Sequence, residues 1–261
     1  MKFDLHCHTK EGSLDGKVGI DEYIRTLKEK GFSGMLVTDH NSYKGYRYWE
    51  QESNKKELED FIVLKGIEYD TSNAGHMLVI IPEDVNPRVL EVRGMPVAVL
   101  IKVVHAYGGI IGPAHPFGEK YMSFANTKAY HCDKDRLMQK FDFVETFNSC
   151  EPLESNRKAK ELAKKYGLSG FGGSDAHRIA CVGTAYAEFT EEIKRESDLI
   201  ALVKEKTPIA TGGVYYHGTT KERIGKVNNI LVYSFWIYNK AAGLFRMHKR
   251  HKWAKDVVFT E

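Results

Sequence analysis

The amino-acid sequence predicts a single α/β domain whose strands are parallel and close into a barrel. Its 261 residues are 42% hydrophobic and 28% charged, a composition typical of a globular protein with a sizeable core. Apolar runs of strand length alternate with helical patterns about seven times along the chain. Because each helical crossover returns the chain to the same edge of a sheet, this alternation favours parallel strands.

The first part of the chain shows clear start and stop signals. The expected strands are residues 2–7, 35–38, 61–68 and 76–81, and the expected helices are residues 21–30 and 44–60. The first helix opens with Asp21 and Glu22 and stops at Lys30-Gly31, which suits the helix dipole and a glycine at the helix end. Residues 44–60 are dense in Glu and Lys, as on a solvated helix face.

The second part continues the same alternation. The expected helices are residues 97–107, 155–166 and 197–206, and the expected strands are residues 110–111, 141–146 and 168–173. The helix at 97–107 follows Met95-Pro96 and ends at Gly108-Gly109, where glycine interrupts the helical pattern. We find no internal repeat and no low-complexity linker, which agrees with one domain.

Histidines and carboxylates follow nearly every expected strand. His6 and His8 are two residues apart on an extended segment, so their side chains share a face. Others close or open later apolar runs, namely Asp39, His40, Glu68, His76, His115, Asp175 and His177. Catalytic groups of an α/β barrel gather at the C-terminal ends of its strands, so we expect one barrel mouth to collect these side chains.

These residue types point to metal binding. Imidazole nitrogens and carboxylate oxygens without thiolates suit Zn²⁺, Mn²⁺ or Fe²⁺. A catalytic zinc uses about three protein ligands, whereas this chain offers about nine, and a carboxylate can bridge two cations about 3.5–4 Å apart. We therefore expect two or three divalent ions of Mn, Fe or Zn.

The cysteines and the N-terminus indicate the compartment. Cys7, Cys132, Cys150 and Cys181 are scattered and form no C-x-x-C pair, which excludes a disulfide scaffold and a zinc ribbon. The first residues lack a long apolar region and carry an acid at Asp4, unlike a signal peptide. A reducing, cytoplasmic location fits these features.

The order of the motifs resembles the PHP (polymerase and histidinol phosphatase) superfamily over roughly residues 1–220. The matching segments are His6-x-His8 with Asp15-Gly16, Thr38-Asp39-His40-Asn41, Gly66-x-Glu68, Gly75-His76, Ala114-His115-Pro116 and Gly173-Ser174-Asp175-x-His177. The resemblance implies a distorted (β/α)7 TIM-like barrel with a trinuclear metal centre at the C-terminal ends of the strands.

The resemblance also implies which side chains hold each ion. The first ion would be held by His6, His8, Glu68 and Asp175. The second would be held by Glu68, His76 and His115, and the third by Asp15, His40 and His177. Many relatives have histidine and others aspartate at the position of Asp15. Asp39 is expected behind a ligand, orienting it.

The activity implied by the resemblance is hydrolysis of a phosphate monoester by metal-activated hydroxide. The substrate would be a small metabolite, a nucleotide or the 5′ end of an oligonucleotide, and His177 or His115 would assist as the acid. A 5′–3′ exonuclease of the same family is one alternative. An amidohydrolase-type C–N hydrolase is another, but it would use a bridging lysine where this chain has Glu68. A metal-free binding module is disfavoured, because no ligand position is lost.

Three basic residues are candidates for binding the substrate's phosphate. Arg178 directly follows His177, and Arg157 is expected in a loop after Glu145-x-x-Asn148. A guanidinium fork matches phosphate oxygens. Lys17, near Asp15, is the third candidate.

Residues 221–261 lie outside the family pattern and are expected to pack on the barrel as an apolar segment with a basic tail. Residues 230–238 are apolar, but nine residues are too short to span a bilayer. Residues 240–255 hold six Lys or Arg and no acid, so they account for the net charge of +3 while the rest of the chain is mildly acidic. This tail could contact a polyanion or form a solvated helix face.

Overall fold

The computed structural model describes residues 1–51, 58, 60–119 and 122–216 and the positions 234, 237, 238 and 241. The strands are β1 (Lys2–Cys7), β2 (Gly34–Val37), β3 (Ile62–Asp70), β4 (His76–Ile80), β5 (Ile110–Pro113), β6 (Phe143–Asn148), β7 (Ser169–Gly173), β8 (Ala185–Glu188) and β9 (Ala210–Gly213). The helices are α1 (Ile20–Glu29), α2 (Lys44–Gln51), α3 (Val97–Ala106), α4 (Lys128–Met138), α5 (Leu153–Tyr166) and α6 (Glu196–Lys204).

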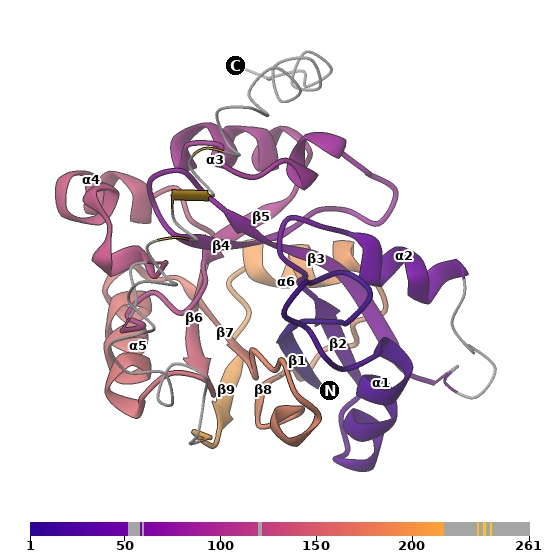
Figure 1. Ribbon diagram of the computed structural model, residues 1–261. Helices are drawn as coiled ribbons and strands as arrows, with labels where there is room; N and C mark the ends of the chain where they lie inside the picture. Colours follow the sequence, from indigo (N-terminus) through magenta and orange to yellow (C-terminus); the bar gives the residue numbers. More distant parts are fainter. Residues whose placement is uncertain are drawn as a thin grey trace.

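The predicted α/β class is confirmed, but the all-parallel (β/α)7 barrel is not what the strands form. A curled sheet in the order β5-β4-β3-β2-β1-β8-β9 faces a separate pair, β6-β7 (Figure 1). Only β1–β2, β2–β3 and β6–β7 pair in parallel among the described strands. The pairs β3–β4, β4–β5, β1–β8 and β8–β9 are antiparallel.

Connection length explains the departure from parallel pairing. Residues 71–75 are all that separates β3 from β4, whereas a parallel crossover needs about a dozen residues or more. The two strands therefore form a hairpin. The β6–β7 pair joins the sheet through hydrogen bonds at both sides: the amide of Asp142 donates to the carbonyl of Ile111, and the amide of Asp175 donates to the carbonyl of His6, each at 2.9 Å.

Most expected helices lie within two residues of their predicted bounds, but three elements were not predicted. These are α4, β8 and β9. β9 is Ala-Thr-Gly-Gly, which has low strand propensity, and it is a strand because it pairs with β8. The helix expected at 44–60 is α2, described as far as Gln51, and the rest of that prediction falls on residues mostly outside the described ranges.

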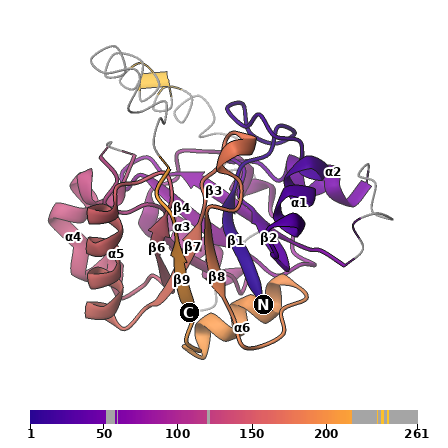
Figure 2. The same cartoon turned by 90° about the horizontal axis from the view of Figure 1, so that it is seen from below.

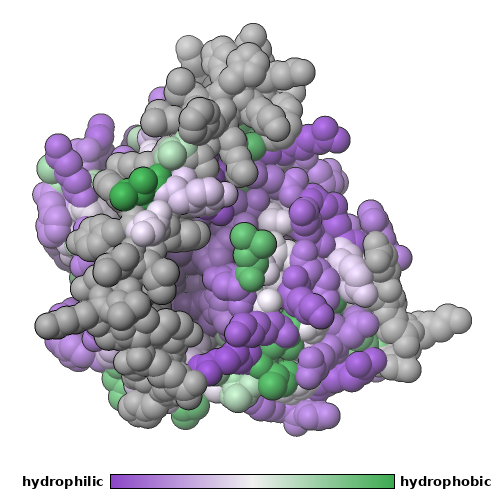
Figure 3. Space-filling view, viewed as in Figure 1, coloured by the Kyte–Doolittle hydropathy of each residue, from purple (hydrophilic) through white to green (hydrophobic). Residues whose placement is uncertain are grey.

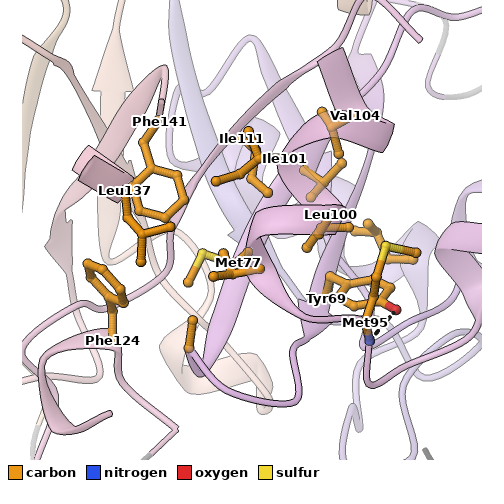
Figure 4. Packing of buried hydrophobic residues seen from close by; sticks show 14 of the residues in the cluster. Tyr69, Met77, Met95, Leu100, Ile101, Val104, Ile111, Phe124, Leu137 and Phe141 are labelled. Carbon is orange, nitrogen blue, oxygen red and sulfur yellow. Dashed lines mark hydrogen bonds between the residues drawn. The ribbon is translucent and has the colours of Figure 1, made fainter. Parts of the chain in front are cut away.

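Three apolar layers pack against the sheet, one of them beneath α1. Figure 4 shows the layer in which Tyr69 of β3, Met77 of β4 and Ile111 of β5 pack against Leu100 and Ile101 of α3. A second layer contains Phe3 and Leu5 of β1 together with α6 residues such as Leu199. α6 lies beside the N-terminal end of β1, and the loop after β1 lies at the opposite end of the strand (Figure 2). The layer that contains α6 thus lies at the N-terminal end of β1 and leaves the other end of this strand uncovered.

The face in Figure 3, viewed as in Figure 1, is mainly hydrophilic, with hydrophobic side chains in small separate areas. None of the helices in the described ranges is long and apolar enough to span a membrane. The predicted domain boundary at 220/221 and nearly all of the basic tail lie outside the described residues. Tyr238 is described, and its ring centroid lies 5.9 Å from the Arg93 guanidinium.

Candidate metal centre

A β-bulge turns His6 and His8 into the interior. Phe3, Leu5 and Cys7 alternate in sequence, so a regular strand would place them on one face. Phe3 and Leu5 instead belong to the layer closed by α6, while Cys7 packs beneath α1. The register of β1 against β2 shifts between Asp4 and Cys7, which moves Cys7 to the outer face and the two histidines to the inner one.

Glu68 lies at the middle of the cluster, and its two carboxylate oxygens face different histidines. Oε1 lies 2.7 Å from Nδ1 of His76 and 3.0 Å from Nε2 of His115. Oε2 lies 3.3 Å from Nε2 of His6, 3.2 Å from Nε2 of His8 and 3.2 Å from Nδ1 of His40. Such a carboxylate is arranged to bridge two cations.

The remaining predicted ligands border this group. Asp175 Oδ1 lies 3.2 Å from Nε2 of His8. Asp15 Oδ2 lies 3.2 Å from Nε2 of His177 and 3.6 Å from Nε2 of His40. Asp15 is half exposed, whereas Glu68 is buried, so the cluster runs from the interior to the surface. All nine predicted metal ligands therefore converge, and their coordination of ions stays a prediction.

Backbone conformation at the strand ends is unusual. Asn41, His115 and Asp175 have φ of +50°, +28° and +51°, in a region that residues other than glycine rarely adopt. Such strained residues concentrate at functional sites, where the surrounding structure holds them. Two of the three are predicted metal ligands, which agrees with a functional centre here.

The electrostatics of the cluster couple acids to imidazoles. Burial opposes ionisation of Glu68, but His76, His40 and His6 outweigh it and lower the pKa of Glu68 well below its usual value. Burial likewise opposes charge on His76, yet Glu68 and Asp70 raise the pKa of His76 to about 10. The buried carboxylates thus favour positive charge beside them. In a metal site, bound cations supply that charge.

The donor set fits divalent ions. Among the described residues, four overlapping groups of side chains could each hold an ion, because the ligand atoms within a group lie within 4.8 Å of one another. The groups are His6, His8 and Glu68; Glu68, His76 and His115; His8, His40 and His177; and His40, Asp70 and His76. Nδ1 of His40 and both ring nitrogens of His76 are buried and have no hydrogen-bond partner among the described residues. Buried polar atoms of native proteins are usually paired, so these nitrogens suit an ion that completes them.

Two carboxylates of the centre were absent from the predicted site. Glu145 is buried, and its Oε1 lies 2.8 Å from Nδ1 of His6 while Oε2 accepts from the amide of His115 at 2.5 Å. Asp70 lies 3.2 Å from Nε2 of His76 and 3.5 Å from Nδ1 of His40. The Glu68-x-Asp70 spacing could have indicated the second, since both side chains share a strand face.

Asp39 anchors a loop and holds no ligand histidine directly. Its carboxylate accepts from the amide of Thr9 at 2.7 Å and from the hydroxyl of Thr9 at 2.8 Å. Ser13, in the loop that follows, lies 3.3 Å from Nδ1 of His8 and accepts from the amide of His40 at 3.1 Å. These contacts fix the segment that carries Asp15 against the ends of β1 and β2.

Of the three predicted substrate-binding residues, two lie beside the cluster and one does not. The amide of Lys17 donates to the carbonyl of His177 at 3.1 Å, and half-buried Arg178 follows that histidine. Arg157 lies in α5, which agrees with the helix expected at 155–166 and contradicts the loop position expected for this residue. Its exposed guanidinium pairs with Glu154 and Glu161. This geometry favours Arg178 and Lys17 over Arg157 as phosphate contacts.

Both predicted proton donors lie in the cluster. Nδ1 of His177 donates to the carbonyl of Asp175 at 2.9 Å, and its Nε2 faces Asp15. Nδ1 of His115 lies 3.3 Å from the hydroxyl of Ser123, and its Nε2 faces Glu68. Each ring thus has a polar neighbour at both of its nitrogens, which fixes its orientation. The role of either histidine as the acid stays a prediction.

Comparison with known sequences points to one family. Residues 154–208 match the PHP_C family, described as PHP-associated. The chain is 37% identical over 112 residues to the uncharacterized protein MJ0417 of Methanocaldococcus jannaschii, covering 40% of this chain and 46% of that one. It is 24% identical over 83 residues to a PolC-type DNA polymerase III of Thermotoga petrophila, covering 27% of this chain and 6% of the polymerase. The chain thus spans less than half the length of each of these relatives.

Several solved structures share this fold. A two-domain protein of Bacteroides vulgatus containing a predicted PHP-like metal-dependent phosphoesterase has a TM-score of 0.59 at 17% identity over 82% of this chain and 64% of that chain. The lesion-specific endonuclease EndoQ of Pyrococcus furiosus has a TM-score of 0.60 at 18% identity, covering 80% of this chain and 57% of that chain. An amidohydrolase of Chromobacterium violaceum with bound sulfate has a TM-score of 0.56 at 14% identity, covering 80% and 97%.

At these identities the structural likeness concerns the fold. It agrees with the PHP-associated match and with the polymerase relative. These findings support the resemblance of the chain to the PHP superfamily.

Proposed function

We propose that this protein is a metal-dependent phosphoesterase that hydrolyses a phosphate monoester at the cluster around Glu68. The observation that carries the proposal is the arrangement of Glu68, with one oxygen facing His76 and His115 and the other facing His6 and His8. A carboxylate so placed, among imidazole nitrogen donors, suits adjacent divalent ions.

Two or three ions of Mn, Fe or Zn would be held by the nine predicted ligands. Bound ions of this kind supply Lewis acidity toward phosphoryl oxygens and lower the pKa of a water molecule. The chain's own groups prepare the site. Glu145 holds Nδ1 of His6, which leaves Nε2 directed toward Glu68 and His8. Asn148 donates to Asp175 Oδ2 at 3.3 Å and so orients that carboxylate.

Residues at the surface end of the cluster would handle the substrate. Arg178 and Lys17 follow or contact His177 and would neutralise the oxygens of a phosphate group. The leaving oxygen would be stabilised by the third ion or by a protonated His177, whose side chain is 30% exposed. A small metabolite ester, a nucleotide or an oligonucleotide 5′ end all present the same terminal phosphate, so exonuclease action belongs to the same chemistry.

An amidohydrolase reaction is the alternative from another chemical class. Such a site would use a bridging lysine, and the lysine of β3, Lys65, has its ammonium 2.8 Å from the carbonyl oxygens of Glu83 and Val85. The residue of β3 at the middle of the cluster is Glu68. Phosphate ester hydrolysis is therefore the better-supported reaction.

The test is release of phosphate from p-nitrophenyl phosphate, nucleotides and a 5′-phosphorylated oligonucleotide with Mn²⁺ present. Asp175→Asn and His8→Ala should reduce the rate by at least about a thousandfold and lower the metal content, because a lost ligand removes several kcal/mol of stabilisation. Arg178→Ala should reduce the rate with metal content intact, because it removes only a phosphate contact. Arg157→Ala, an arginine already paired on the face of α5, is the matched control.

One result would replace the proposal. If metal-loaded wild-type protein cleaves no phosphate ester but hydrolyses a cyclic amide or lactone, the amidohydrolase alternative is correct.

A further inference from the structure

Asp70 is a buried carboxylate that the nine-ligand set does not use. Its side chain is 3% exposed, and neither oxygen has a hydrogen-bond partner among the described residues. An ionised carboxylate is rarely buried unless positive groups or an ion surround it. Three basic side chains lie within 3.5 Å of it, namely His40, His76 and Arg93.

The backbone fixes Asp70 opposite His76. The two residues are directly paired in the antiparallel β3–β4 hairpin, where paired side chains on one face lie close together. The amide of Asp70 donates to the Asn41 side chain at 2.9 Å, and its carbonyl accepts from the amide of Gly94 at 2.8 Å. Both backbone polar groups of Asp70 are thus hydrogen-bonded, and the register of the two strands brings its side chain close to His76.

The two nitrogens of His76 face different carboxylates. Nδ1 lies 2.7 Å from Oε1 of Glu68, toward the group that includes His115. Nε2 lies 3.2 Å from Oδ1 of Asp70, on the far side of the ring. A metal-binding histidine commonly uses one nitrogen for the ion and gives the other N–H to a carboxylate, which fixes its tautomer and orientation.

The centre already contains one such arrangement. Glu145 Oε1 lies 2.8 Å from Nδ1 of His6, whose Nε2 faces Glu68. Asp70 lies beside the outer nitrogen of His76 as Glu145 lies beside that of His6, but at 3.2 Å and outside hydrogen-bond geometry. It also reaches His40, whose Nδ1 lies 3.5 Å from the same oxygen and whose Nε2 faces Asp15.

We propose that Asp70 is a positioning residue shared by two predicted ligands, holding His76 and His40 so that their other nitrogens face two different ions. The Arg93 guanidinium, 3.5 Å from Oδ2, keeps the second oxygen turned away from the histidines. One carboxylate thereby couples the ion position around Glu68, His76 and His115 to the one around His40, Asp15 and His177. This role rests on the proposed metal centre.

The test is a titration with Mn²⁺, in which electron paramagnetic resonance measures the free ion. Asp70→Ala should weaken binding by about 10- to 100-fold without changing the number of ions bound at saturation, as expected when a carboxylate behind a ligand is removed. Asp70→Asn should weaken it less, because the amide keeps an oxygen beside the ring nitrogen that can accept its N–H. Asp133→Ala, which removes an exposed carboxylate paired with Arg136 on α4, should leave binding unchanged.

Each other outcome has a defined meaning. Equal loss of one whole ion in Asp70→Asn and Asp70→Ala would overturn the positioning role and make Asp70 a direct ligand. Affinities equal to wild type in both would also overturn it. If Asp70→Ala does not fold by circular dichroism, Asp70→Asn decides: its affinity must lie between those of wild type and His76→Ala. A wild-type protein that binds no Mn²⁺ would instead contradict the proposed function.

Discussion

At the residue scale, the centre is organised by charge pairing between buried carboxylates and imidazoles. Burial opposes ionisation of Asp175, but His6, His8 and His177 lower the pKa of Asp175 well below its usual value. The histidines respond in the opposite direction: His6, although buried, has its pKa raised well above the usual value by Glu145, Asp175 and Glu68. This pairing favours the protonated form of the His6 ring when no cation is bound.

Metal uptake should therefore release protons. The pKa of His76 is raised from 6.5 to about 10, so its ring is protonated at pH 8 in the metal-free protein, and an ion binds only the neutral nitrogen. We expect at least about one proton released per chain at pH 8 and an affinity that rises with pH toward about 10. Calorimetric titration with Mn²⁺ in two buffers of different ionisation enthalpy measures the release.

The raised pKa of His76 also determines how the free energy of unfolding of the metal-free protein changes with pH. Because the ring titrates near 6.5 when unfolded, its raised pKa stabilises the metal-free native state fully below pH 6.5, and this contribution is lost as pH rises through about 10. His76→Ala should release fewer protons than wild type. Equal release by the two proteins would contradict this account.

At the element scale, the β3–β4 hairpin decides the position of three side chains of the centre. Glu68 and Asp70 come from β3 and His76 from β4, and the turn between the strands includes Gly75 with φ of +75°. The amide of His76 donates to the carbonyl of Met122 at 2.8 Å, which holds the start of β4. The turn is therefore part of what places His76.

Gly75→Ala should be strongly destabilising. A Cβ there would lie 2.1 Å from the carbonyl oxygen of Met122, in addition to the cost of a positive φ. Gly31 also has φ of +75°, but nothing lies within 4 Å of its Cβ position, so Gly31→Ala is the matched control. Gly31→Ala should cost about 1–2 kcal/mol from conformation alone, and Gly75→Ala about 3 kcal/mol or more.

Urea unfolding of the metal-free proteins measures these costs. Gly75→Ala should also weaken Mn²⁺ binding, because the start of β4 must move, whereas Gly31→Ala should not. Equal costs for the two variants would show that the Met122 contact carries no constraint.

At the scale of the whole molecule, the excess of basic over acidic residues lies in one segment. Residues 240–255 hold six Lys or Arg without an acid, and all six lie outside the described residues. A basic segment on a phosphoesterase would attract a polyanionic substrate through its phosphates.

Neutralising Lys249, Arg250 and Lys252 together should therefore separate two classes of substrate. Oligonucleotide binding should weaken and its salt dependence should flatten by about one unit of slope per lost phosphate contact, since fewer counterions are released. Hydrolysis of p-nitrophenyl phosphate should stay unchanged. Binding measured across a salt series tests this, and equal loss on both substrates would show that the tail serves the fold instead.

Local patterns in the sequence determined much of this protein. The spacing of His6 and His8, the polar residues that follow apolar runs, and the glycine and proline signals predicted the α/β class, most helices and eight of the nine ligand side chains that converge. The ninth, Asp15, came from the family resemblance. These features depend on neighbours a few residues apart, so they can be recognised without knowing the fold. Glu68-x-Asp70 was of the same kind and could have been recognised.

The tertiary structure decided what depends on pairing between distant segments. The bulge in β1 turns His6 and His8 inward, the β3–β4 hairpin sets Asp70 against His76, and β6 brings Glu145 to His6 across 139 residues of chain. β9 is a strand only because β8 provides a partner. Strand register, and with it the face of the sheet on which a side chain lies, is set by hydrogen bonding to another strand. A local sequence pattern does not encode this pairing.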